Sequence, residues 1–119
     1  MTSGGRGRAL LAVAVAVQLA VLYWPRAGGG GLPYVDKLVH VAIFAAVAWA
    51  GCRAGVPHRV LVPLLVAHAV VSEVVQDRLL AGRSGDPADV AADLVGTGLG
   101  LLLAHRSGTL RGLRASWRA

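Results

Sequence analysis

The sequence predicts an all-α integral membrane protein, a bundle of four transmembrane helices with both termini in the cytoplasm. Of the 119 residues, 55% are hydrophobic and only 15% are charged, whereas soluble domains carry about 25% charged residues. The apolar residues fall into four tracts, separated by short segments that contain arginine, glycine or proline. This composition excludes a disordered chain and argues against a soluble enzyme.

The four apolar tracts predict the four helices in order. They cover about residues 9–24, 37–52, 60–80 and 88–104. Three of them are short for a spanning helix of about 20 residues, so we expect their polar ends to enter the bilayer as well. Asp86-Pro87 predicts the start of the fourth helix, because Asp is a good N-cap and Pro suits the first turn. The basic tail, residues 105–119, is expected to lie on the lipid surface as a short amphipathic helix.

The distribution of charge predicts the orientation. Eight arginines and no acidic residue occupy the N-terminus, the 53–59 loop and the C-terminal tail. All six carboxylates lie toward the opposite side, which the positive-inside rule identifies as the outer side of the plasma membrane. No small-x-small cleavage site follows the first tract, so we expect it to remain as an uncleaved helix. The net charge of +6 flanks apolar tracts, so we predict no nucleic-acid partner.

Ionisable side chains gather near the predicted outer ends of the second, third and fourth helices. Helical spacing puts Asp36 and His40 on one face, and Asp89 and Asp93 on another. Glu73 would lie about 12 Å below the outer end of its helix. A charge facing lipid at such depth costs at least about 2.5–3.5 kcal/mol, so these groups should face one another or a wet cavity. The candidate ligand-binding residues are Asp36, Lys37, His40, Glu73, Gln76, Arg83, Asp89 and Asp93.

These residues form motifs in a characteristic order. The motifs are Asp36-Lys37-x-x-His40, Glu73-x-x-Gln76, an arginine at 83, and Asp89-x-x-x-Asp93 followed by Gly96 and Gly100. Over about residues 33–104 the chain resembles the VanZ-like family. The resemblance implies a small multi-pass protein of the bacterial cell envelope, related to accessory factors in resistance to teicoplanin-type glycopeptides. Asp93 departs from the family, which usually has Asn there, so its burial calls for a proton or a cation.

Three kinds of function fit the polar cluster. We favour non-enzymatic binding of a membrane lipid, a lipid-linked wall precursor, an amphiphilic glycopeptide or a membrane-protein partner, with Lys37 and Arg83 facing an anionic head group. Alternatively, an intramembrane hydrolase or transferase would use the carboxylates with His40, as acid and base or around a divalent ion. A structural or regulatory partner is the third. We assign no catalytic residue, metal ligand or cofactor, and the GxxxG spacing of Gly96 and Gly100 predicts close helix packing.

Overall fold

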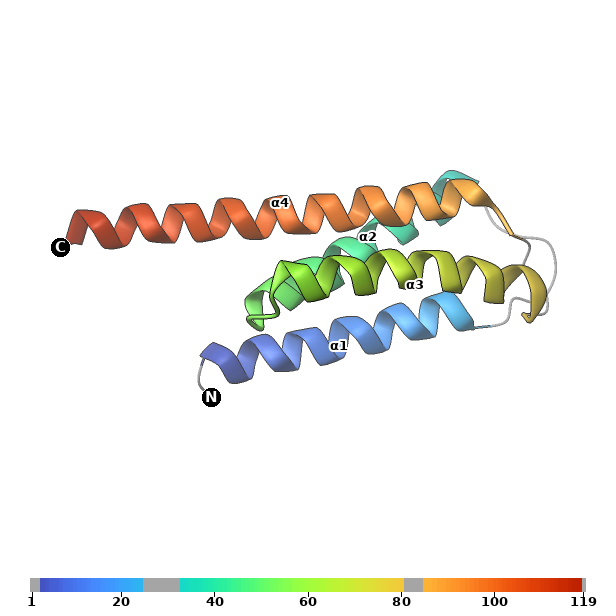
Figure 1. Cartoon of the computed structure of the whole chain (residues 1–119), viewed down its shortest axis with the longest axis horizontal. Coiled ribbons are helices and arrows are strands. Elements are labelled where there is room, and N and C mark those ends of the chain that lie inside the picture. Colours follow the sequence, from blue (N-terminus) through green and yellow to red (C-terminus); the bar gives the residue numbers. More distant parts are fainter. Residues whose placement is uncertain (1–2, 25–32, 81–84, 119) are drawn as a thin grey trace.

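The computed structural model of the chain is all-helical and describes residues 3–24, 33–80 and 85–118, with side chains up to Gly108 (Figure 1). The helices are α1 (Ser3–Tyr23), α2 (Pro33–Arg53), α3 (His58–Arg78) and α4 (Pro87–Arg118). Each contains a stretch of at least 20 residues that is long and apolar enough to cross a membrane. The helices alternate in direction, so the start of α1 and the end of α4 lie at the same end of the bundle.

The helix ends differ from the limits of the predicted tracts. The first helix begins at Ser3 rather than near residue 9, and the second at Pro33 rather than near residue 37. The third ends at Arg78, two residues before the predicted limit of 80. Hydropathy marks only the apolar part of a helix, whereas its hydrogen bonds continue through polar residues. Pro33 also suits a first turn, since the N–H that proline lacks would have no partner there.

The start of α4 is confirmed, but its end is not. Pro87 is the first helical residue, and the Asp86 carboxylate accepts a hydrogen bond from the Ala88 N–H at 3.0 Å, as an N-cap does. The helix then runs to Arg118, so the tail prolongs α4 and does not form a separate amphipathic helix. No proline follows Pro87 to interrupt the helix, and Gly108 costs only about 1 kcal/mol relative to alanine. This part of α4 projects beyond the other helices (Figure 1).

Two glycines bring α4 into close contact with α2. Gly96 and Gly100 are buried, and a Cβ added at either position would collide with a carbonyl oxygen of α2, that of Val41 or that of Ala45. Helix backbones approach this closely only where small residues line the contact. The glycine face is therefore covered by α2 of the same chain, and the first turns of α2 and α4 are held side by side.

The interior contains both apolar and polar side chains. The apolar core consists of Leu22, Ile43, Phe44, Val47, Ala48, Leu61, Leu65 and Ala69. The buried polar residues are Gln18, His40, Ser72, Gln76, Asp89, Asp93 and Thr97. Many leucines and valines of all four helices face outward instead. This arrangement, with ionisable side chains inside the bundle and large aliphatic side chains on its outer surface, is expected of helices surrounded by lipid.

Candidate polar site at the start of α2 and α4

Lys37 links the first turn of α2 to the start of α4. Its Nζ lies 2.6 Å from Asp86 Oδ2 and 2.5 Å from Asp89 Oδ1. Asp86 precedes α4, and the hydrogen bond from Lys37 lowers the pKa of its carboxyl below the ordinary value of 3.8. The predicted role for Lys37 was to meet an anionic head group. In the structure its charge is already shared between two carboxylates.

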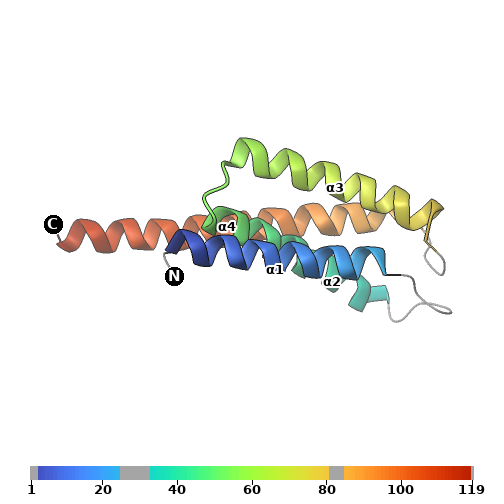
Figure 2. The same ribbon diagram turned by 90° about the horizontal axis from the view of Figure 1, so that it is seen from below.

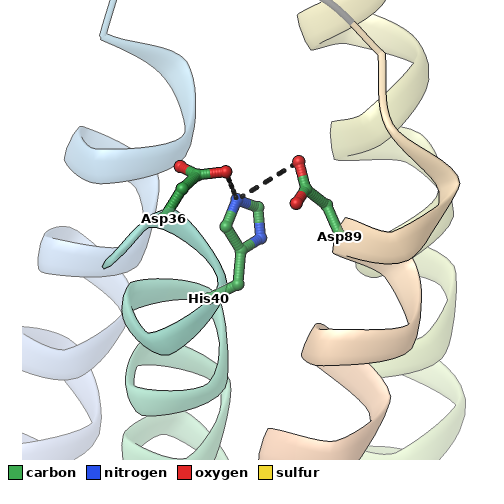
Figure 3. Close-up of side chains that lie close together, drawn as sticks. All are labelled: Asp36, His40 and Asp89. Carbon is green, nitrogen blue, oxygen red and sulfur yellow. Dashed lines mark ion pairs between the residues drawn. The ribbon is translucent and has the colours of Figure 1, made fainter. Parts of the chain in front are cut away.

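His40 lies between carboxylates of α2 and α4 (Figure 3). It is 2% exposed, and its Nδ1 is 2.6 Å from Oδ1 of Asp93, which is 1% exposed. Its Nε2 faces Asp36 Oδ2 at 3.9 Å and Asp89 Oδ2 at 3.7 Å. Both distances are longer than a hydrogen bond. Asp93 thus holds the ring, and Nε2 points into the space between two other carboxylates.

The two predicted residues of α3 have different partners. Glu73 Oε1 accepts a hydrogen bond from the Asp86 N–H, whereas its Oε2 is buried with no hydrogen-bond partner among the described residues. Gln76 is buried and donates from Nε2 to the Leu22 carbonyl of α1 at 2.9 Å. Glu73 therefore belongs to the polar site, while Gln76 ties α3 to α1.

Negative charge predominates at this end of the bundle. The carboxylates are those of Asp36, Glu73, Asp86, Asp89 and Asp93. In the described part of the chain, Lys37 is the lysine or arginine that pairs with them. Arg83, the other predicted cation of the site, lies outside the described residues. Carboxylates gathered this closely hold protons or need further cations, because like charges disfavour the ionised form of each.

Asp86 has a larger role than the helix cap that its position in the sequence predicts. We expected a helix cap, and the cap is there, but the same carboxylate also pairs with Lys37. Its backbone N–H further contacts Glu73. The signal that could have found this was the position of Asp86 itself, one turn from Asp89 and at the outer end where Lys37 also lies. Because the N-cap role alone accounts for an aspartate at this position, the sequence does not require Asp86 to belong to the site.

An apolar cavity of about 350 Å³ lies between α1, α2 and α3. Leucines and valines form most of its lining, with Gln18 and His68 as its polar members. The Gln18 Nε2 is buried and has no hydrogen-bond partner among the described residues. His68 Nε2 lies 2.9 Å from the Tyr23 hydroxyl. Figure 2 shows α3 inclined to the other helices. The sequence signal for this cavity was Gln18, a lone amide inside an apolar tract.

Fold and site together define a class of protein: an all-helical chain with four helices long and apolar enough to span a membrane, and a carboxylate–histidine cluster buried at one end. Comparisons of the chain with protein-family models, with curated proteins and with solved structures give no match. Since a fold alone does not define a function, we infer the function from the residues of the site.

Proposed function

We propose that the chain is a multi-pass protein of the bacterial plasma membrane, with both termini in the cytoplasm and the polar site toward the outer side. Two features support this arrangement: the four apolar helices, and the position of the start of α1 and the end of α4 at the same end of the bundle. The arginines of the N-terminus, the 53–59 loop and the region after residue 105 also belong to that end. The positive-inside rule favours the cytoplasm for it.

The function we propose is binding of an amphiphilic, lipid-linked cell-wall precursor, through which the protein contributes to resistance to teicoplanin-type glycopeptides. The resemblance to VanZ-like proteins suggests the link to glycopeptide resistance. One observation carries the proposal: helices that are apolar enough to span a membrane hold both a charged cluster at one end of the bundle and an apolar cavity between α1, α2 and α3. An amphiphile needs a polar site for its head group and an apolar surface for its chain.

Along the axis of α3, less than two helical turns separate the cluster from the cavity. His68 lines the cavity and Glu73 belongs to the polar site, and their separation along α3 is about 7.5 Å at the rise of an α-helix. The lipid tail of a ligand whose head group is held at the cluster would need to extend less than two helical turns along α3 to reach the cavity. Lys37 is already paired, so a pyrophosphate head group would enter this acidic site together with a cation.

Photo-crosslinking tests the proposal. The full chain, in phosphatidylglycerol vesicles, receives a polyprenyl pyrophosphate with a photoreactive group in its lipid chain. We expect cross-links to the cavity segments of α1 and α3. Leu64→Trp, at a cavity residue 63% exposed, should reduce them severalfold, whereas Leu102→Trp, at a residue of α4 outside the cavity lining and 47% exposed, should not. Cross-links spread equally over all helices, as a phosphatidylglycerol probe would give, contradict the proposal.

The contact between His40 and Asp93 favours a second candidate, an intramembrane hydrolase or transferase acting on the same substrate class. A carboxylate on Nδ1 stabilises the tautomer in which Nε2 can accept a proton, as in carboxylate–histidine pairs of hydrolases. The test is release of phosphate from polyprenyl pyrophosphate. Turnover that His40→Gln abolishes while cross-linking persists supports the enzyme. Cross-linking without turnover in the wild type leaves the binding function.

A further inference from the structure

Three potential metal ligands converge from the first turns of α2 and α4. One ligand atom from each of Asp36, His40 and Asp89 lies within 4.8 Å of the others. Figure 3 shows the two carboxylates directed toward the same ring nitrogen from opposite sides. Because Gly96 and Gly100 hold the two helices in close contact, this convergence is built into the packing of the bundle.

The distances fit ligands of a common ion better than direct hydrogen bonds. His40 Nε2 is 3.7 Å from Asp89 Oδ2 and 3.9 Å from Asp36 Oδ2, beyond hydrogen-bond length. Zinc binds histidine nitrogen and carboxylate oxygen at about 2.0–2.2 Å, so two ligands of one ion are at most about 4.4 Å apart. Both pairs that include His40 lie within this limit. The Asp36 and Asp89 oxygens lie within 4.8 Å of each other, so these two carboxylates are the ligands that an ion would draw closer together.

The orientation of His40 provides an independent observation. The side chain is more than nine-tenths buried, and the two carboxylates that its Nε2 faces lie at 3.7 and 3.9 Å, beyond hydrogen-bond length. The other ring nitrogen is held by Asp93 at 2.6 Å. Metal-bound histidines usually donate their second N–H to a carboxylate, which leaves the first nitrogen directed at the ion. An oriented imidazole nitrogen that faces two carboxylates, both beyond hydrogen-bond distance, points to a ligand that is a Lewis acid.

Asp89 is oriented in the same way. Its Oδ1 accepts a hydrogen bond from Lys37 at 2.5 Å, and its Oδ2 faces His40 Nε2. One carboxylate oxygen thus fixes the group while the other is directed into the site. Among the described residues, the carboxylates of the cluster outnumber the lysines and arginines seen to pair with them, which also favours uptake of a cation.

We propose that Asp36, His40 and Asp89 bind one divalent first-row metal ion, with Asp93 and Lys37 as positioning residues. Two carboxylates and an imidazole suit Zn²⁺ or Mn²⁺ better than Mg²⁺ or Ca²⁺, which prefer oxygen ligands alone. Three protein ligands leave coordination positions open. A phosphate oxygen of the head group would bind there, and only this last step rests on the proposed function.

Metal titration of the full chain in mild detergent, stripped with chelator and free of added lipid, tests the site. We expect one Zn²⁺ per chain by calorimetry and one Mn²⁺ by electron paramagnetic resonance. His40→Gln and Asp89→Asn should each weaken Zn²⁺ binding by at least about 100-fold, and Asp93→Asn by about 10- to 100-fold. Asp77→Asn is the matched control, because Asp77 is exposed and contacts the Gly85 N–H outside the cluster.

Stoichiometry near zero in the wild type overturns the proposal, as does Zn²⁺ binding that neither His40→Gln nor Asp89→Asn weakens. A measurement on the wild type covers the case in which a variant fails to fold. Pulsed electron paramagnetic resonance of bound Mn²⁺ should show coupling to one imidazole nitrogen, and its absence contradicts His40 as a ligand. Because no lipid is present, failure here leaves the lipid-binding proposal to be decided separately by cross-linking.

Discussion

Two glycines of α4 allow a matched test of how close packing maintains the site. Gly96 and Gly98 lie on the same helix, and each can be changed to alanine. At Gly98 nothing lies within 4 Å of an added Cβ, whereas at Gly96 the Cβ would collide with the backbone of Val41. Only the surroundings of the added methyl group differ between the two variants.

The expected magnitudes have opposite signs. Alanine is favoured over glycine in a helix by about 1 kcal/mol, so Gly98→Ala should leave the free energy of unfolding unchanged or raise it by about that amount. At Gly96, α2 and α4 must separate by about 1 Å to restore an ordinary contact near 3.5 Å. Overpacking of this kind costs about 1–3 kcal/mol, and because the helix preference for alanine applies equally at both positions, Gly96→Ala should be less stable than Gly98→Ala by about that amount. Since Gly96 lies one turn from Asp93, the same separation would lengthen the contact between Asp93 and His40.

Steric trapping in bicelles measures the free energy of unfolding of both variants. We expect Gly96→Ala to be less stable than the wild type and than Gly98→Ala. It should also bind Zn²⁺ more weakly if the site depends on the distance between the helices. Equal stability of the two alanine variants would show that α2 and α4 are not in backbone contact at Gly96.

Further predictions concern charge, orientation and resistance. In Lys37→Met the pKa of Asp86, measured by carbon NMR, should return toward its ordinary value of 3.8. The pair with Lys37 contributes stability above that pKa and loses it as the pH falls through the lowered value, so the variant should be less stable near neutral pH and lose less stability on acidification. A fluorescent protein fused after residue 119 should be bright, because this end of the chain is expected in the cytoplasm. A reporter enzyme that is active only outside the plasma membrane, fused at the same position, should be inactive. Expression of the chain in a susceptible host should raise the inhibitory concentration of teicoplanin at least twofold, and His40→Gln should remove the increase.

The helices could be predicted from the sequence far better than their ends. Four apolar tracts with breakers between them indicate four helices, because hydropathy and helix-breaking residues act locally. Where each helix begins depends on how far its backbone continues beyond the apolar tract, to Ser3 in α1, and on the tolerance of a first turn for Pro33 in α2. The continuation through residue 105 was missed because a change from apolar to basic composition alters the surroundings of a helix without ending it.

The candidate site could likewise be predicted only in part from the sequence. Helical spacing places Asp36 with His40, and Asp89 with Asp93, because residues four apart share a face. Which carboxylate meets which nitrogen depends on the rotation and separation of α2 and α4, and no local pattern contains that information. The pairing of His40 with Asp93, and of Lys37 with two aspartates, therefore required the structure. The same holds for Gln76, whose spacing from Glu73 suggested a site residue but whose amide reaches the Leu22 carbonyl.

The most direct test of the central claim, that the polar end of the bundle is a ligand-binding site, is native mass spectrometry of the full chain extracted from its membrane in mild detergent. We predict a bound polyprenyl pyrophosphate-type lipid in the wild type and in Asp77→Asn, and its loss in His40→Gln and in Asp89→Asn. Absence of such a lipid from the wild type would contradict the claim. Equal retention of the lipid in the wild type and the three variants would contradict it as well. Either result would leave the polar cluster as a network that only fixes the packing of α2 against α4.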